Sequence, residues 1–175
     1  EEEEAPAPSA GAAAAEPAAG VRRYRSDKEG FSVDYPAAWR ASQKPVKTHL
    51  EEVNLLSDTS KGTELGVSVD PVKIDTVTAF GTPLQVGKRV VALERSKDGV
   101  LSAKLIAVGQ EDRDGVPYYT IEYASESTRG NRRFLAKVAI VRRRLFVLTA
   151  QAKTDSFAAD EAALRAGLAS FAVDP

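Results

Sequence analysis

Two residue types are missing from this chain of 175 residues, which has no cysteine and no methionine. The lack of cysteine excludes disulfides, iron–sulfur clusters, thiolate zinc sites and thiol catalysis. The lack of methionine, an initiator included, is expected of a chain from which a targeting peptide has been removed or of one that has been artificially shortened. The single histidine, His49, excludes sites built from several histidines. No apolar run approaches the ~18 to 20 residues of a membrane-spanning helix, so none is predicted.

Sequence motifs for nucleotide binding and acyl transfer are missing as well. The chain has no Gly-x-x-x-x-Gly-Lys-[Ser/Thr], no Gly-x-Gly-x-x-Gly and no Gly-x-Ser-x-Gly. We therefore predict that the protein is not an enzyme, holds no cofactor, and leaves His49 exposed and non-catalytic. Asp112 and Asp114 imitate part of a calcium loop, but Val116 and Tyr123 stand where that loop needs oxygen ligands. A plain hairpin turn, and no metal centre, is predicted there.

Charge divides the chain into two parts. Residues 1–20 contain five glutamates, no Lys or Arg, and no residue large enough to anchor them in a core. Because such a segment cannot offset its ordering entropy, we predict a disordered acidic Ala/Pro-rich tail over residues 1–20 and one folded domain over residues 21–175. Without those five glutamates the chain has 24 basic and 20 acidic residues. That excess is too small for a nucleic-acid-binding protein, so no nucleic-acid partner is predicted.

Alternation of apolar and polar residues predicts the strands. Phe31, Val33 and Tyr35 share one face of the first strand, and Trp39, shortly after it, is expected to pack in the core. The last strand is largely apolar on both faces, which predicts a central strand covered on both sides. The predicted strands span residues 30–36, 53–56, 65–69, 101–108, 118–123, 134–140 and 145–150.

Helical spacing of apolar residues appears in two segments. Thr82 followed by Pro83 predicts the start of a helix over residues 83–94. The closing helix is predicted from Leu164, Leu168 and Phe171, with Asp155 or Ser156 as its N-cap. Consecutive hairpins with segregated helices predict an α+β fold with a central, mainly antiparallel sheet.

Four ordered motifs and the closing Ser170-Phe171 resemble the PsbP family. They are GFSVDYPAAW at residues 30–39, FGTP at 80–83, DGVPYYTIEY at 114–123 and LFVLTAQA at 145–152. The resemblance spans residues 24–173. It implies an α/β/α sandwich whose central, mainly antiparallel sheet is flanked by helices.

The resemblance also implies a function and a location. It implies a non-enzymatic extrinsic subunit or assembly factor in the chloroplast thylakoid lumen, peripheral to the membrane and not inserted. The implied partner is the lumenal face of a photosynthetic membrane complex: photosystem II, photosystem I or the NADH dehydrogenase-like complex. The oxygen-evolving member of the family carries a GG[RK]H run where residues 129–134 read RGNRRF, so a PsbP-like paralogue is favoured.

Two alternatives remain open from the sequence. A small-molecule or ion-binding lumenal carrier would need a deep cleft between sheet and helix with convergent polar groups. A Ran-binding nuclear-transport factor shares the implied architecture, although the GF…YP..W and LTAQA motifs favour the PsbP side.

Arginine clusters are the predicted docking residues, because a guanidinium pairs a carboxylate through two hydrogen bonds and suits an acidic protein surface. The alternative for each cluster is ordinary solvated charge in a turn. The N-terminal cluster is favoured, because the resemblance implies docking through the N-terminal region. The predicted docking residues are Arg22, Arg23, Arg25, Arg132, Arg133, Arg142, Arg143 and Arg144.

Overall fold

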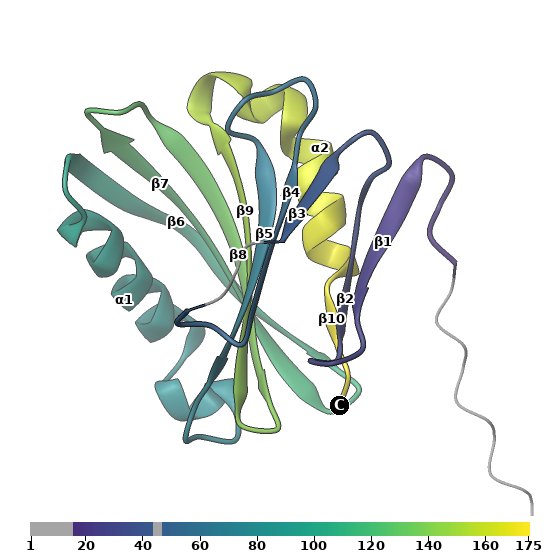
Figure 1. The fold of residues 1–175 in the computed structure, drawn as a ribbon. Helices are drawn as coiled ribbons and strands as arrows, with labels where there is room; N and C mark the ends of the chain where they lie inside the picture. The colour runs from purple at the N-terminus through teal and green to yellow at the C-terminus, as the bar shows by residue number, and fades with distance from the viewer. Residues whose placement is uncertain (1–15, 44–46) are drawn as a thin grey trace, which may run out of the picture.

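The computed structural model describes residues 16–43 and 47–175, which form two antiparallel sheets and two α-helices (Figure 1). The predicted tail over residues 1–20 lies outside the described residues as far as residue 15. The larger sheet has the strand order β3 (Arg40–Gln43), β4 (Glu51–Leu56), β5 (Glu64–Pro71), β9 (Arg144–Lys153), β8 (Arg132–Val141), β7 (Val116–Ser127) and β6 (Val100–Arg113). The smaller sheet has the order β1 (Val21–Ser26), β2 (Phe31–Pro36) and β10 (Ala172–Val173).

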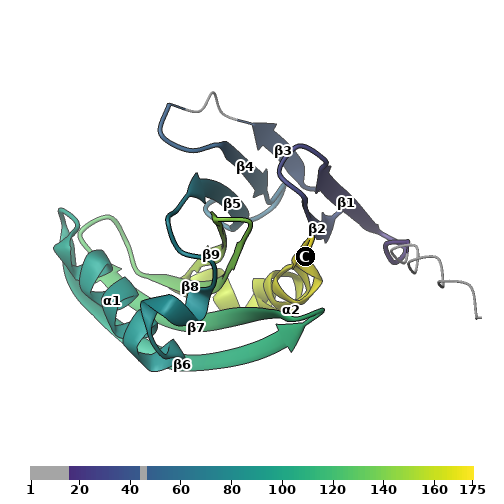
Figure 2. The ribbon, with the colours of Figure 1, turned by 90° about the horizontal axis from the view of Figure 1, so that it is seen from below.

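The two helices cover opposite faces of the larger sheet. Helix α1 (Pro83–Ser96), preceded by the short 3-10 helix η1 (Val77–Phe80), packs on β6 and β7. Helix α2 (Thr154–Ser170) packs on β8 and β9 from the other side and lies between the two sheets (Figure 2). Along β8 the side chains alternate between the two cores, so the expected α+β fold with a mainly antiparallel sheet and a helix on each face is confirmed.

Aromatic packing joins the smaller sheet to the rest of the molecule. The strand predicted over residues 30–36 is β2, which begins one residue later, and its alternate residues Phe31, Val33 and Tyr35 are buried as expected. The Phe31 ring meets the Phe146 ring edge-on at 6.1 Å between centroids, which places β2 against β9 through a favourable T-shaped contact. Trp39 is only 8% exposed and belongs to the same core, as predicted.

The start of α1 follows the sequence signal closely. The Thr82 side chain accepts a hydrogen bond from the Gln85 backbone, and the Gln85 side chain accepts one from the Thr82 backbone. This reciprocal pair satisfies two backbone donors that the helix itself cannot. At Gly87 an added Cβ would lie 2.8 Å from Val108 Cγ1, so the glycine allows α1 to approach β6 closely.

The turn between β6 and β7 is the plain hairpin that was predicted. Asp114 and Gly115 have φ angles of 52° and 78°. A two-residue hairpin loop of type I′ needs positive φ at both positions, and Asp-Gly is a preferred pair for it.

The predicted cap of the closing helix is wrong. The N-cap of α2 is Lys153, the last residue of β9, and no side chain caps the helix. Because β9 runs directly into α2, the cap position falls on a side chain that cannot accept a hydrogen bond. The Ser156 hydroxyl instead donates to the Lys153 carbonyl at 3.3 Å.

The prediction of a last strand covered on both faces is only half right. Strand β9 is central, between β5 and β8, and one face of it is buried. On its other face Val147, Thr149 and Gln151 are partly exposed, because α1 packs on β6 and β7 and leaves this part of the sheet uncovered. The strand buried on both faces is β8.

Candidate functional site

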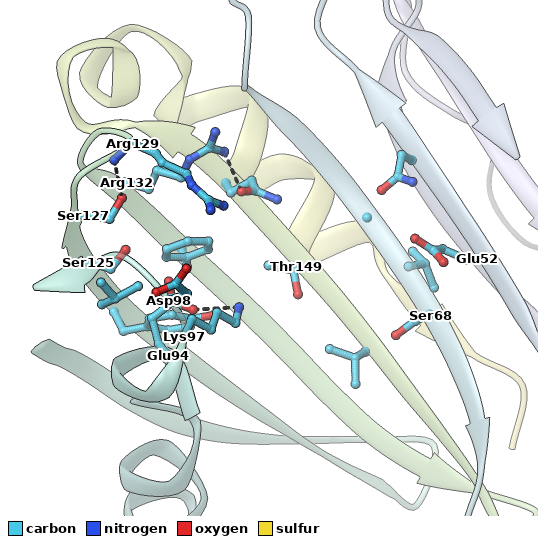
Figure 3. A pocket seen from close by; sticks show the side chains of 18 of the residues that line it. Glu52, Ser68, Glu94, Lys97, Asp98, Ser125, Ser127, Arg129, Arg132 and Thr149 are labelled. Atoms are coloured by element: carbon cyan, nitrogen blue, oxygen red, sulfur yellow. Dashed lines mark hydrogen bonds and ion pairs between the residues drawn. The ribbon is translucent and has the colours of Figure 1, made fainter. Parts of the chain in front are cut away.

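The uncovered part of the larger sheet is a cleft with a volume of about 710 Å³. Its floor is formed by β4, β5, β9, β8 and the end of β7, and its sides by the end of α1 and the turn between β7 and β8. Figure 3 shows Arg129 and Arg132 at one end, Glu52 and Ser68 at the other, and Thr149 between them. The size falls in the range of small-molecule pockets, although the lining is more polar than is usual.

The floor of the cleft is set by strand register. Asn54 pairs with Gly66, and Gly66 pairs with Thr149, so these three residues form one row across β4, β5 and β9. A Cβ at Gly66 would lie 3.0 Å from Asn54 Oδ1, so the missing side chain keeps the floor open. The Asn54 Nδ2 atom is buried and has no hydrogen-bond partner among the described residues. The row therefore offers donors and acceptors to whatever enters the cleft.

Two arginines define one end of the cleft. Arg132 Nη1 donates to Gln151 Oε1 at 2.9 Å, and Gln151 Nε2 donates to Glu64 Oε1 at 2.8 Å. Arg129 lies in the turn after β7, where its backbone N–H donates to Ser127 Oγ at 3.1 Å. The turn is thus fixed locally, and it places the Arg129 side chain beside Arg132 (Figure 3).

Acidic side chains also line the cleft. Glu94, near the end of α1, is 6% exposed and pairs with Lys97 at 2.8 Å. Burial, together with the nearby Glu94 carboxylate, raises the pKa of the Tyr123 hydroxyl well above its ordinary value, so this tyrosine stays protonated. Glu52 and Asp98 complete the acidic set. The cleft therefore carries charges of both signs.

His49 also lines the cleft, and its surroundings differ from the prediction. It was expected to be exposed, but its side chain is 36% exposed and its Nδ1 lies 2.6 Å from Asp70 Oδ1. Sequence alone gave no sign of this pair, because the two residues are brought together by the β4–β5 hairpin. Within residues 16–43 and 47–175 no three His, Cys, Asp or Glu residues gather as a metal would require.

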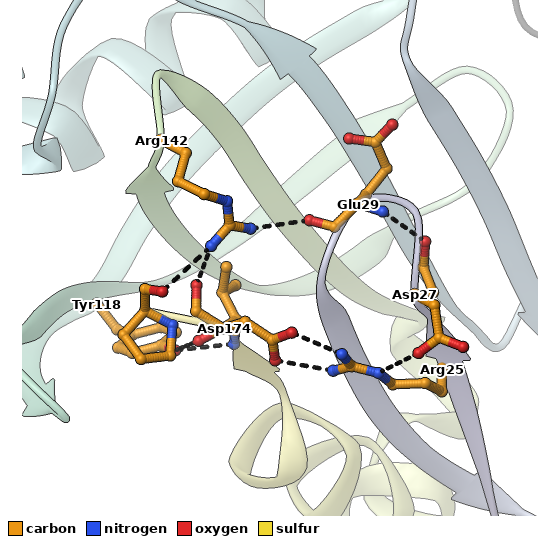
Figure 4. Close-up of polar contacts among 9 residues, drawn as sticks. Arg25, Asp27, Glu29, Tyr118, Arg142 and Asp174 are labelled. Carbon is orange, nitrogen blue, oxygen red and sulfur yellow. Dashed lines mark hydrogen bonds and ion pairs between the residues drawn. The ribbon is translucent and has the colours of Figure 1, made fainter.

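Some of the predicted docking arginines meet at the opposite end of the molecule (Figure 4). Arg25 binds the Asp174 carboxylate through two hydrogen bonds of 2.8 and 2.6 Å. Arg142 donates to the backbone carbonyls of Glu29 and Asp174. Arg144 Nη1 lies 2.5 Å from Glu29 Oε2, and that carboxylate is only 2% exposed. These three arginines hold the β1–β2 hairpin to the β8–β9 turn and to the C-terminal residues.

The remaining predicted arginines are spread over several elements. Arg23 pairs with Asp34 across the β1–β2 ladder at 2.7 Å. Arg133 pairs with Glu122 on β7, and its guanidinium lies over the Phe157 ring at 4.4 Å from the centroid. Arg143 forms an exposed pair with Asp75 at 3.1 Å.

Arg22 differs from the others because it is exposed and its side chain has no hydrogen bond or ion pair within the described segments. Most of the predicted docking arginines therefore already have partners within the chain. Arg22 and the exposed Arg143 are the ones most available to another protein.

The cleft residues Ser125, Arg129 and Thr149 were not found from the sequence. A signal existed for one of them. On β7 the residues that face α1 are apolar or aromatic as far as Tyr123 and then change to Ser125 and Ser127. That change marks where the helix ceases to cover the strand. That Thr149 and Arg129 line the cleft could be predicted only from the strand order and the turn geometry, and the sequence pattern alone gives neither.

The structure defines an α+β protein whose mainly antiparallel sheet carries a helix on each face, a polar cleft and an arginine-rich end. The family model described as PsbP matches residues 19–173. The chain belongs to the PsbP family, and the family membership inferred from the motifs is confirmed.

Two curated relatives are similar over part of their length. PsbP domain-containing protein 2, chloroplastic, of Arabidopsis thaliana is 30% identical over 122 residues, which are 69% of this chain and 50% of that protein. CyanoP of a Synechocystis strain is 29% identical over 107 residues, which are 60% of this chain and 57% of that protein. The chain thus spans about half the length of the curated relatives it matches.

Solved structures agree with the fold. The solution structure of CyanoP from Synechocystis superposes with a TM-score of 0.74 at 25% identity, covering 90% of this chain and 95% of that one. The crystal structure of LpqN of Mycobacterium tuberculosis, described as involved in cell envelope biogenesis, matches with a TM-score of 0.56 at 11% identity over 89% of this chain and 92% of that one. The second likeness concerns the fold alone. Across the described segments, neither helix has the length and apolar character needed to cross a bilayer.

Proposed function

We propose that the protein is a non-enzymatic, peripheral protein of the thylakoid lumen that docks on a photosynthetic membrane complex as an extrinsic subunit or assembly factor. The observation that carries this proposal is the match of the PsbP family model to residues 19–173. The relative described as chloroplastic supports the location. The complex is photosystem II, photosystem I or the NADH dehydrogenase-like complex, and the experiment below is designed to distinguish the three.

Exposed arginines supply the physical basis for docking. Arg22 is exposed and unpaired within the described segments, and Arg143 is exposed beside Asp75, which is also exposed. An acidic protein surface can therefore pair with Arg22 and Arg143 without leaving a buried carboxylate of this chain unpaired. Binding that rests on such contacts weakens as salt screens them, because the Debye length falls from about 10 Å at 0.1 M salt to about 3 Å at 1 M.

The test is retention on thylakoid membranes followed by identification of the neighbour by crosslinking. The wild-type protein should be retained at low salt, be released by moderate salt, and crosslink to subunits of one complex. The double variant Arg22→Gln/Arg143→Gln should need less salt for release. A variant that loses the same charge at other exposed sites, Lys61→Gln/Lys88→Gln, is the matched control and should behave as wild type. Recovery of the wild-type protein only as a free monomer at every salt concentration would contradict the proposal.

A second candidate, a small-molecule or ion-binding lumenal carrier, is supported by one observation, the polar cleft of about 710 Å³. Native mass spectrometry of protein purified gently from its own membranes tests it. A carrier should retain a small ligand whose mass disappears on mild denaturation, whereas a docking protein should show the bare chain.

A further inference from the structure

Arg129 and Arg132 line the same cleft, and no carboxylate of the described chain pairs with either of them. Within the described segments neither forms an ion pair, and the only side-chain partner of Arg132 is the neutral Gln151. Seven other arginines of the described chain have carboxylate partners: Arg23, Arg25, Arg113, Arg133, Arg143, Arg144 and Arg165. Two neighbouring cations that line a cleft and have no carboxylate partner favour the binding of an anion there.

The guanidinium of Arg132 is held in place before any ligand arrives. Glu64 accepts from Gln151, and Gln151 accepts from Arg132 Nη1, so a chain of two hydrogen bonds orients the group. One of its five N–H donors is used in this way, and the others remain for a ligand. A planar guanidinium with free donors matches the two oxygens of a carboxylate.

Ser125 adds a donor beside the arginine pair. The residue is 4% exposed and lines the cleft, and its hydroxyl has no hydrogen-bond partner within the described segments. Ser125 on β7 is the register partner of Arg132 on β8, so the two side chains stand next to each other on the same face of the sheet. The hydroxyl is therefore available to a ligand in the space in which the arginines lie.

We propose that Arg129, Arg132 and Ser125 form a binding subsite for a single carboxylate group. Asp98, which shares the cleft, disfavours an anion of higher charge, because a second negative group would be repelled. The carboxylate belongs either to a small free organic acid or to an acidic side chain of a docked protein. This subsite lies away from Arg22 and Arg143, so it does not depend on the docking proposed above.

Acetate is the probe for the subsite itself. Backbone amide signals of the full chain, labelled with ¹⁵N, are followed while chloride is replaced by acetate at constant ionic strength, with the uncharged isostere acetamide as the control ligand. Acetate should shift the amides of β7, β8 and the turn between them, and acetamide should not. Arg132→Gln, Arg129→Gln and Ser125→Ala should each weaken acetate binding, with the arginine variants weaker by about tenfold.

Arg22→Gln is the matched control, because it removes an exposed arginine that also lacks a carboxylate partner. It should leave the acetate response unchanged. Since Arg129 is exposed and pairs with no acid, its replacement tests the subsite even if Arg132→Gln perturbs the fold. Equal responses to acetate and acetamide, or an acetate response that survives in both Arg129→Gln and Arg132→Gln, would overturn the proposal.

A second arm distinguishes the two sources of the carboxylate. Retention on thylakoid membranes is compared between wild type and Arg129→Gln/Arg132→Gln at one salt concentration. Weaker retention of the variant assigns the carboxylate to a docked protein, whereas equal retention together with a positive acetate titration assigns it to a free organic acid. If wild type is not retained at all, the docking proposal fails while the acetate titration still decides the subsite.

Discussion

Replacing Arg144 by glutamine should destabilise the protein strongly, although the residue lies in an arginine-rich turn. Its partner Glu29 is 2% exposed, and the Nη1–Oε2 distance is 2.5 Å. Removing one member of a buried pair costs about 3 to 5 kcal/mol, because the other charge is left without compensation. Arg144 itself is 38% exposed, so water can partly replace it, and Lys28 Nζ still lies 3.9 Å from Glu29 Oε1, so the cost falls below that range. We expect a loss of about 2 to 3 kcal/mol in the free energy of unfolding.

Denaturation by urea, followed through the fluorescence of Trp39, measures this loss. Trp39 is the only tryptophan and is buried, so its emission should report the global transition. For a chain of this size the loss corresponds to a fall in Tm of roughly 5 to 10 °C. Arg143→Gln, next in sequence, breaks only an exposed pair and should cost less than about 0.5 kcal/mol.

A double-mutant cycle completes the test. In Glu29→Gln/Arg144→Gln no charge is left buried, so the double variant should recover part of the stability lost in Arg144→Gln. If Arg144→Gln unfolds within about 0.5 kcal/mol of wild type, the Glu29 carboxylate is not buried as described and the reasoning is refuted. The result also shows whether Arg144 variants can be used in docking assays, because a destabilised variant would bind membranes less through unfolding and not through the loss of a docking contact.

Three further outcomes are expected. Thr82→Ala removes the capping side chain of α1 and should cost about 1 kcal/mol in urea denaturation, whereas Thr82→Ser should restore most of it. Gly167→Ala places a Cβ 2.6 Å from Cδ1 of Leu65, which is fully buried. The clash should lower the free energy of unfolding by about 1 to 2 kcal/mol, although alanine has the better helix propensity. An unchanged Tm would show that α2 can shift. Arg25 lowers the pKa of Asp174, so the contribution of this pair is present above the ordinary carboxyl pKa and is lost as the pH falls through the lowered value; Asp174→Asn should remove that part of the pH dependence of Tm.

Much of the fold could be predicted from local patterns. Alternation placed Phe31, Val33 and Tyr35 on a buried face, Thr82 and Pro83 marked the start of α1, and Asp114-Gly115 marked the hairpin. These signals are local, because each depends on residues within a few positions of one another. They succeed where the backbone geometry and the side-chain pattern agree.

The rest depended on contacts between distant segments. Strand β1 is rich in arginine, and its charges were interpreted as docking residues, whereas Arg23 and Arg25 pair with Asp34 and Asp174 of this chain. Strand β10 has only two residues, too few for any periodic signal. The cleft exists because α1 covers one half of a sheet face, and no sequence pattern states which strands a helix will cover.

Strand β9 gives the cleft a mechanical property that a loop-built site would lack. Phe146, Leu148 and Ala150 anchor the strand in the core, while the intervening Val147 and Thr149 form the cleft floor. A slip of one residue would exchange the two sets and expose the core, so the floor cannot remodel without partial unfolding. A ligand that bound to this floor would meet a preformed surface, so little affinity would be lost to ordering the protein.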